Sequence, residues 1–165
     1  MNIFEYAMKM EEDGRAYYLE NAEKMTIPGL KRILLEMADD ELKHYAIFRA
    51  MRNQEQVEYI ESEKTTIIDT VKNVFEQLKN ENKNIGDESD TIRIWEVARD
   101  VEKKAEEFYR EKAAEVNDKH SKDILAKIAD EEHRHWATIE NVMQFLEAPK
   151  QWLEDAEWNN KLDTF

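Results

Sequence analysis

The sequence contains no cysteine. A chain without thiols forms no disulfide, and it cannot bind zinc or an iron centre through thiolate ligands. Any metal that this chain binds must therefore be held by nitrogen and oxygen ligands.

Glycine and proline are also scarce, with three Gly and two Pro among 165 residues. These residues interrupt helices, whereas the plentiful Glu, Lys, Ala, Leu and Met favour them. Hydrophobic residues make up 41% of the chain, which is enough to bury a core. We therefore expect an all-α bundle domain at residues 1–148, followed by a helical tail at residues 149–165.

Basic residues are outnumbered by acidic ones, and long apolar runs are lacking. The 24 basic residues stand against 38 acidic ones, and the resulting net charge of −14 repels phosphate backbones and anionic lipids. No segment approaches the roughly 18 apolar residues of a membrane-spanning helix, and the N-terminus has no basic segment followed by an apolar run. We expect a cytoplasmic protein that binds neither nucleic acid nor membrane.

Residues 3–46 and 94–137 form an internal repeat. When the two segments are compared at an offset of 91 positions without a gap, 15 of the 44 residue pairs are identical. The identical pairs include Glu11/Glu102, Glu41/Glu132 and His44/His135. The repeat predicts two duplicated helical hairpins.

Apolar residues at helical spacing predict four long helices, at about residues 2–25, 28–53, 89–116 and 118–148. Asn2 and Glu5 can cap the first helix, and Pro28 suits the first turn of the second. A break is expected at Ile85-Gly86-Asp87, and Pro149 ends the fourth helix.

The two hairpins are joined by a segment of about 35 residues, in which residues 67–78 predict a shorter crossover helix. Two hairpins with one long crossover are the ferritin-like arrangement of a four-helix bundle. The tail carries apolar residues, among them Trp152, Trp158, Leu162 and Phe165. We expect it to form a short helix that packs on the bundle or on a second subunit.

Each of the four long helices carries a glutamate on its apolar face. These residues are Glu11, Glu41, Glu102 and Glu132. The glutamates of each hairpin lie 15 residues from its turn, near residues 26 and 117. At about 1.5 Å per residue this distance is roughly 22 Å, near the middle of a bundle. Four carboxylates are therefore predicted to converge in the interior.

A histidine follows three residues after the glutamate in the second and fourth helices, as His44 and His135, and so shares its face. Buried carboxylates without a positive partner cost several kcal/mol. A Glu from each of two helices and Glu-x-x-His from each of the other two form the ligand set of di-iron and di-manganese bundles. The six residues predict a site for two iron ions, with manganese or zinc as possible substitutes.

Other polar residues have weaker assignments. Tyr18 and Tyr109 follow a predicted ligand by two helical turns, so their phenols could hydrogen-bond a ligand or relay an electron, or simply pack in the core. Asp40 and Glu131 each directly precede a predicted ligand. Their carboxylates could contact a histidine ring without binding the metal and so orient the ring, or they could simply be solvated. The two remaining histidines, His120 and His133, are expected to be exposed and not to bind metal.

The segments Lys9-Met10-Glu11-Glu12-Asp13-Gly14 and Ala38-Asp39-Asp40-Glu41-Leu42-Lys43-His44 resemble the ferritin-like superfamily, and in particular its rubrerythrin-related branch. The resemblance covers nearly the whole chain. It implies the same six metal ligands, metal-flanking tyrosines at Tyr18 and Tyr109, and a homodimer. The long crossover would permit exchange of hairpins between subunits.

The chain departs from that family pattern in two ways. Full-length rubrerythrins carry a cysteine-ligated rubredoxin domain, so a chain without cysteine implies an external electron donor such as a rubredoxin. Rubrerythrins also commonly have a second Glu where this sequence has Ala105, which makes the predicted site more like the symmetric one of bacterioferritin. Glu106, one position later, could partly substitute.

These observations favour a di-iron oxidoreductase, a peroxidase or oxidase that reduces hydrogen peroxide or dioxygen. One alternative is a ferroxidase that oxidises ferrous ion and hands it on. A second is a helical binding module in which the metal is structural or absent.

Overall fold

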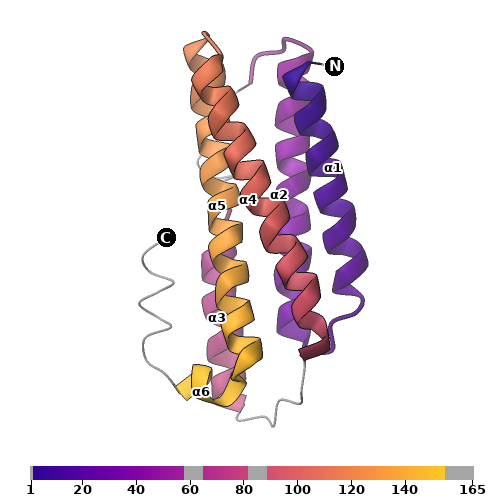
Figure 1. The fold of residues 1–165 in the computed structure, drawn as a ribbon, viewed down its shortest axis with the longest axis vertical. Helices are drawn as coiled ribbons and strands as arrows, with labels where there is room; N and C mark the ends of the chain where they lie inside the picture. The colour runs from indigo at the N-terminus through magenta and orange to yellow at the C-terminus, as the bar shows by residue number, and fades with distance from the viewer. Residues whose placement is uncertain (1, 58–64, 82–88, 155–165) are drawn as a thin grey trace.

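Four long helices run side by side in the computed structural model, which describes residues 2–57, 65–81 and 89–154 (Figure 1). They are α1 (Ile3–Ala22), α2 (Pro28–Arg52), α4 (Ile92–Glu115) and α5 (Lys119–Glu147). The described residues contain no strand, so the prediction of an all-α fold is confirmed. None of the described helices is long and apolar enough to cross a lipid bilayer.

Capping residues fix where these helices begin. Asn2 Oδ1 accepts a hydrogen bond of 2.8 Å from the backbone N–H of Glu5 at the start of α1. Pro28 is the first residue of α2, as predicted. Asp118 caps α5 by accepting a 3.0 Å hydrogen bond from the backbone N–H of Ser121. Helix α1 ends at Ala22, earlier than predicted.

The crossover between the hairpins contains the predicted helix, α3 (Ile67–Glu81). It packs against α2 and α5 through the buried face that includes Val71, Val74 and Phe75, and it lies alongside the lower part of the bundle (Figure 1). The 3-10 helix η2 (Ser89–Thr91) leads into α4. The predicted break at residues 85–87 lies outside the described residues.

The tail begins with the short helix α6 (Pro149–Glu154), where Trp152 and Leu153 are buried. The Trp152 ring meets the Phe75 ring edge-on, with centroids 6.0 Å apart. The first part of the tail therefore packs on α3, as one of the two predicted placements requires. The rest of the tail, including Trp158, Leu162 and Phe165, lies outside the described residues, and the domain boundary and the homodimer stay predictions.

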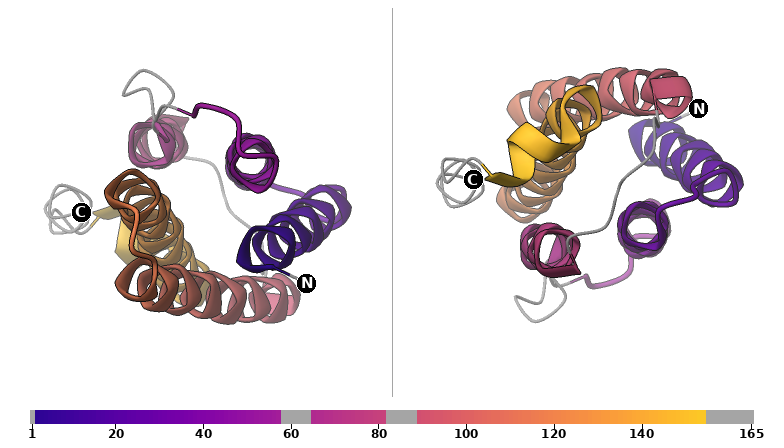
Figure 2. Two further views of the ribbon diagram at one scale, coloured as in Figure 1. Left: turned by 90° about the horizontal axis from the view of Figure 1, so that it is seen from above. Right: turned by 90° about the horizontal axis from the view of Figure 1, so that it is seen from below.

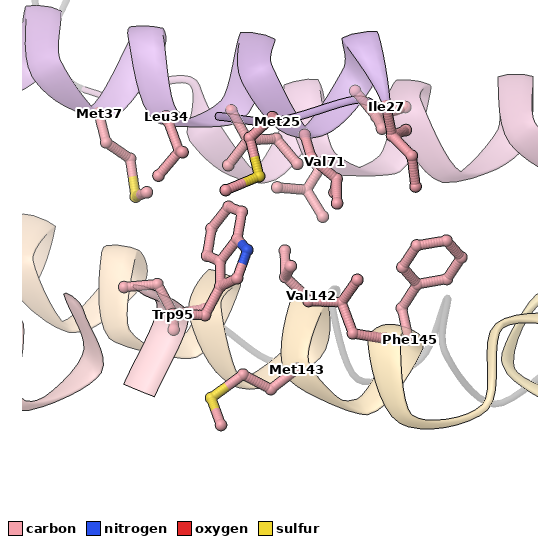
Figure 3. Close-up of a cluster of buried hydrophobic side chains, with 14 of the residues drawn as sticks. Met25, Ile27, Leu34, Met37, Val71, Trp95, Val142, Met143 and Phe145 are labelled. Carbon is pink, nitrogen blue, oxygen red and sulfur yellow. The ribbon is translucent and has the colours of Figure 1, made fainter. Parts of the chain in front are cut away.

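The apolar core consists of two clusters, one toward each end of the bundle. The larger one joins the lower parts of the long helices to α3 and α6, and includes Met37, Trp95 and Phe145 (Figure 3). The other is built around Phe48 and Tyr109. Viewed along their axes, the long helices surround a shared interior (Figure 2). Between the two clusters lies a layer of buried polar side chains.

Candidate metal centre

Six side chains from four helices meet in this polar layer, and all are the residues that sequence periodicity predicts. Each is 4% exposed or less: Glu11, Glu41, His44, Glu102, Glu132 and His135. They meet because each lies on the inward face of its helix at mid-length, with apolar residues above and below. The structure therefore brings the whole predicted set together.

The six side chains form two overlapping groups. In the first group, Glu11, Glu41, His44 and Glu132 each offer one ligand atom, and these atoms lie within 4.8 Å of one another. The second group, with the same spacing, consists of Glu41, Glu102, Glu132 and His135. Glu41 and Glu132 belong to both groups. The arrangement therefore outlines two adjacent cation positions that share two carboxylates.

Each histidine directs its Nδ1 atom toward the carboxylates. His44 Nδ1 lies 2.8 Å from Glu132 Oε1 and 3.5 Å from Glu11 Oε2. His135 Nδ1 lies 3.3 Å from both Glu41 Oε1 and Glu102 Oε1. The two rings stack with centroids 6.4 Å apart, so the two halves of the repeat place equivalent nitrogens on either side of the shared carboxylates.

The opposite ring nitrogens are held by a second pair of carboxylates. His44 Nε2 lies 3.1 Å from Glu131 Oε1, and His135 Nε2 lies 2.8 Å from Asp40 Oδ2. In both pairs the carboxylate comes from the other hairpin and is buried. An Nε2–H bonded in this way leaves Nδ1 free to bind a metal. The suggested orienting contacts of Asp40 and Glu131 are therefore present.

One residue of this network, Thr65, is absent from the sequence-based prediction. Its hydroxyl donates a hydrogen bond to Asp40 Oδ2, and it is buried just before α3. The crossover thus supports the carboxylate that orients His135. No sequence signal marks Thr65, because its partner lies 25 positions earlier and in a different element.

The two predicted tyrosines contact the glutamates across the repeat. Tyr18 donates a hydrogen bond to Glu102 Oε1, and Tyr109 donates one of 2.7 Å to Glu11 Oε1. Burial, reinforced by the neighbouring carboxylate charges, raises the pKa of both phenols well above its ordinary value. Both phenols therefore stay protonated and act as donors. The predicted contact with a ligand glutamate is present, although each partner belongs to the other hairpin.

Several atoms of the cluster make no hydrogen bond of acceptable geometry with the described residues, although some of them lie within ion-pair distance of one another. They are Glu11 Oε2, Glu41 Oε1, His44 Nδ1, Glu102 Oε2 and Glu132 Oε1. Buried polar atoms of folded proteins are normally satisfied, so such a set requires an explanation. All five are ligand-type atoms directed into one small volume, which is the arrangement expected around cations.

The pKa shifts of the cluster also indicate a site for cations. Burial, followed by the repulsion of the neighbouring carboxylates, raises the pKa of Glu41 and of Glu132 well above the ordinary value. Burial opposes protonation of the two histidines, but the adjacent carboxylates outweigh it and raise the pKa of His44 and of His135. The cluster thus requires positive charge, which either protons or cations can supply. The residues present fit two divalent cations.

The remaining histidines are not part of this cluster. His120 is exposed and bonds through Nε2 to the backbone oxygen of Val57. The His133 side chain is 44% exposed, and its Nδ1 lies 3.0 Å from Glu106 Oε1. Glu106 also accepts a 2.8 Å hydrogen bond from Arg110, so it is engaged away from the cluster. It does not replace the carboxylate missing at Ala105.

Comparisons with known proteins agree with this site. A family model described as Rubrerythrin matches residues 2–143, which include all six residues of the cluster. The searches of curated proteins and of solved structures gave no match.

Proposed function

Because the chain belongs to the rubrerythrin family, we propose that it is a non-haem di-iron peroxidase that reduces hydrogen peroxide, or dioxygen, with electrons from an external donor. The family itself indicates a di-iron protein with an oxidoreductase-type function. The observation that carries the proposal is the pair of overlapping buried ligand groups that share Glu41 and Glu132.

The ligand assignment follows from the two groups. Glu11 and His44, together with Glu41 and Glu132, would hold one ion, and Glu102 and His135, together with the same two shared glutamates, would hold the other. Four carboxylates balance the four positive charges of two ferrous ions. The mixture of carboxylate oxygen and imidazole nitrogen suits iron or manganese, and zinc could substitute.

Two ferrous ions held in this way would supply the two electrons that, with two protons, reduce hydrogen peroxide to two water molecules. The protein's own residues prepare the site for this reaction. Asp40 and Glu131 fix the rings of His135 and His44. The apolar clusters on either side keep bulk water away from the carboxylates, which strengthens every charge interaction inside.

Tyr18 and Tyr109 are assigned a positioning role. Each holds one terminal carboxylate, Glu102 or Glu11, in a fixed orientation by a hydrogen bond from a buried phenol. A phenol in direct contact with a ligand is also well placed to pass an electron. The relay of an electron by the two tyrosines, which the sequence suggests, stays part of this proposal.

The electrons must come from elsewhere, because the chain has no cysteine with which to hold an iron–sulfur or rubredoxin centre of its own. A small electron-transfer protein such as a rubredoxin is the donor that we propose.

Ferroxidase activity is the second candidate. Its support is the symmetry of the ligand set. This chain has Ala105 at the position where rubrerythrins commonly have a second Glu, so both cation positions have equivalent ligands. Such a centre would oxidise ferrous ion and release it, instead of retaining two ions through turnover.

The test begins with protein purified without air, in which elemental analysis should find about two irons per chain. Rapid mixing with hydrogen peroxide should then give a diferric absorption band, and oxidation should stop at two irons unless a reductant is added. Continued oxidation of added ferrous ion, with accumulation of mineral, would favour the ferroxidase. If iron-loaded protein is not oxidised by either hydrogen peroxide or dioxygen, the redox function is wrong.

The double variant Glu41→Ala/Glu132→Ala is the control, because it removes both shared carboxylates. It should lose iron and the absorption band together. If every activity survives in this variant, the centre is not functional, and the binding-module alternative is favoured over both redox candidates.

A further inference from the structure

Thr65, at the start of the crossover helix α3, is connected to the metal centre through one carboxylate. Its buried hydroxyl donates a hydrogen bond to Asp40 Oδ2, and the same oxygen lies 2.8 Å from His135 Nε2. His135 in turn directs its Nδ1 atom into the cluster, 3.3 Å from Glu102 Oε1. Two contacts that share one oxygen atom therefore join a histidine of the cluster to the crossover.

Asp40 can transmit a constraint because both of its carboxylate oxygens are engaged. Oδ2 contacts Thr65 and His135, and Lys43 Nζ lies 3.8 Å from Oδ1. The Asp40 side chain is only 3% exposed, so solvent does not replace these partners easily. A fixed His135 ring therefore holds Asp40 in place, and Asp40 holds Thr65.

The Thr65 hydroxyl also takes part in starting α3. The backbone N–H of Ile67 donates a hydrogen bond of 3.2 Å to Thr65 Oγ1, so a single hydroxyl contacts both the helix and Asp40. Side chains that accept in this way satisfy backbone N–H groups that the first turn of a helix leaves unpaired. The first turn of α3 therefore depends on the position of Thr65, and through it on Asp40.

The rest of α3 depends on packing along one face. Its apolar residues are buried on the side that contacts α2, α5 and α6, whereas the opposite side is exposed at Asp69, Asn73, Glu76 and Asn80. A single helix of 15 residues is marginal in water without such packing. Elements of this kind open locally at a lower free-energy cost than the whole domain. Helix α3 therefore has the features of an element that can open while the four long helices stay together.

We propose that Asp40 and Thr65 couple the crossover helix α3 to the occupancy of the metal centre, so that a bound cation orders α3 and loss of the cation loosens it. A cation on Nδ1 would fix the His135 ring, whereas hydrogen bonds and ion pairs alone hold it in the metal-free protein. By thermodynamic linkage, a docked α3 that strengthens metal binding is itself stabilised by the metal by the same factor. The inference rests on the metal-binding part of the proposed function and not on its redox reaction.

The coupling makes the crossover a sensor of metal loading. Opening of α3 exposes its apolar face, which includes Val71 and Phe75, and uncovers Trp152 of α6, whose ring packs on Phe75. Exposed apolar surface of this kind is what proteases and chaperones act on in cells. A chain that has lost its metal is therefore distinguished from a loaded one at the crossover.

Hydrogen–deuterium exchange tests the coupling without any redox step. The metal-free protein and the protein saturated with Mn²⁺ are compared, and exchange in each helix is resolved by mass spectrometry of peptides. Metal should slow exchange of the α3 amides by a factor typical of coupled sites, about 5–150-fold. The ratio of the two rates is taken within each protein, so that a change in the intrinsic stability of α3 cancels.

Variants at two neighbouring threonines show whether the effect passes through Asp40. Thr65→Val removes the hydroxyl that contacts Asp40, so the slowing of α3 by metal should be lost while that of α5 stays. Thr65→Ser keeps the hydroxyl and should keep the slowing. Thr66→Val is the matched control, because the Thr66 hydroxyl donates a 2.7 Å hydrogen bond to Glu36 Oε1, outside the cluster. This variant should also keep the slowing.

Calorimetric titration of each protein with Mn²⁺ ensures that exchange is compared at saturation. If the original protein binds Mn²⁺ but α3 exchanges equally with and without it, this inference alone is wrong. Slowing that persists in Thr65→Val, or that is lost equally in Thr66→Val, would overturn it as well, because the effect would not pass through Asp40. If the original protein binds neither Mn²⁺ nor Fe²⁺, the proposed function fails and the inference fails with it.

Discussion

Tyr109 of α4 donates its hydrogen bond to Glu11 Oε1 of α1 over 2.7 Å, although a different glutamate, Glu102, lies two turns earlier on its own helix. Tyr18 makes the reciprocal contact from α1 to Glu102. Each hairpin therefore orients the terminal carboxylate of the other. The same exchange joins Asp40 to His135 and Glu131 to His44, so neither half of the repeat completes its site alone.

Replacing Tyr109 by Phe should weaken this connection while keeping the packing of the ring. The variant leaves a buried carboxylate oxygen without its donor, and a hydrogen bond to a charged group contributes about 1.5–3 kcal/mol. We expect a loss of that size in the free energy of unfolding of the metal-free protein, measured with urea. Tyr45→Phe, on the partly buried α2 surface, should change it by far less.

Replacing Asp40 by Asn should lower metal affinity without removing a ligand. Although burial opposes its ionisation, the hydrogen bond to His135 and the charge of that ring lower the pKa of Asp40, so it is a carboxylate at neutral pH. Loss of such a partner typically weakens metal binding about 10–100-fold. Competition with a chelator measures the change.

The exposed neighbour Asp39 provides the control for this prediction, because Asp39→Asn removes the same charge without touching a histidine. Thr65→Val should act in the same direction as Asp40→Asn but more weakly, since Thr65 contacts Asp40 and not the ring. Equal metal affinity in the Asp40 and Asp39 variants would contradict the assigned role.

The sequence predicts the helices and the six-residue cluster because both depend on spacing along a regular helix. A glutamate on an apolar stripe, repeated 91 positions later, must lie inside the bundle at a known height. The crossed tyrosine contacts depend instead on how the hairpins are rotated about each other, which spacing within one helix does not determine. Thr65 escapes prediction for a similar reason, since its role depends on a hydrogen bond to one atom of a distant residue, Asp40.

Gly29→Ala should destabilise the fold while leaving the metal centre intact. A Cβ atom at position 29 would collide with Val74 Cγ1, so α3 would have to move away from α2. Overpacking of this kind costs about 1–3 kcal/mol, which exceeds the gain of up to about 1 kcal/mol from replacing Gly in a helix. Thermal unfolding should therefore shift to lower temperature.

The double variant Gly29→Ala/Val74→Ala tests the cause of that shift. Removing the two Val74 methyl groups makes room for the new Cβ, so the double variant should lose less stability than the sum of the two single variants. Iron content should stay at the original value in all three. Additive losses would show that the contact with Val74 is not responsible.

Metal binding should strengthen as the pH rises and should release protons. Because the pKa of Glu41, Glu132, His44 and His135 is raised in the metal-free cluster, these groups hold protons that a cation must displace. Lowering the pH therefore favours the protonated, metal-free form. Calorimetric titration with Mn²⁺ under nitrogen, in buffers of different ionisation enthalpy, counts the protons. We expect more than one per chain at neutral pH, and a release of none would mean that the metal-free cluster is already deprotonated.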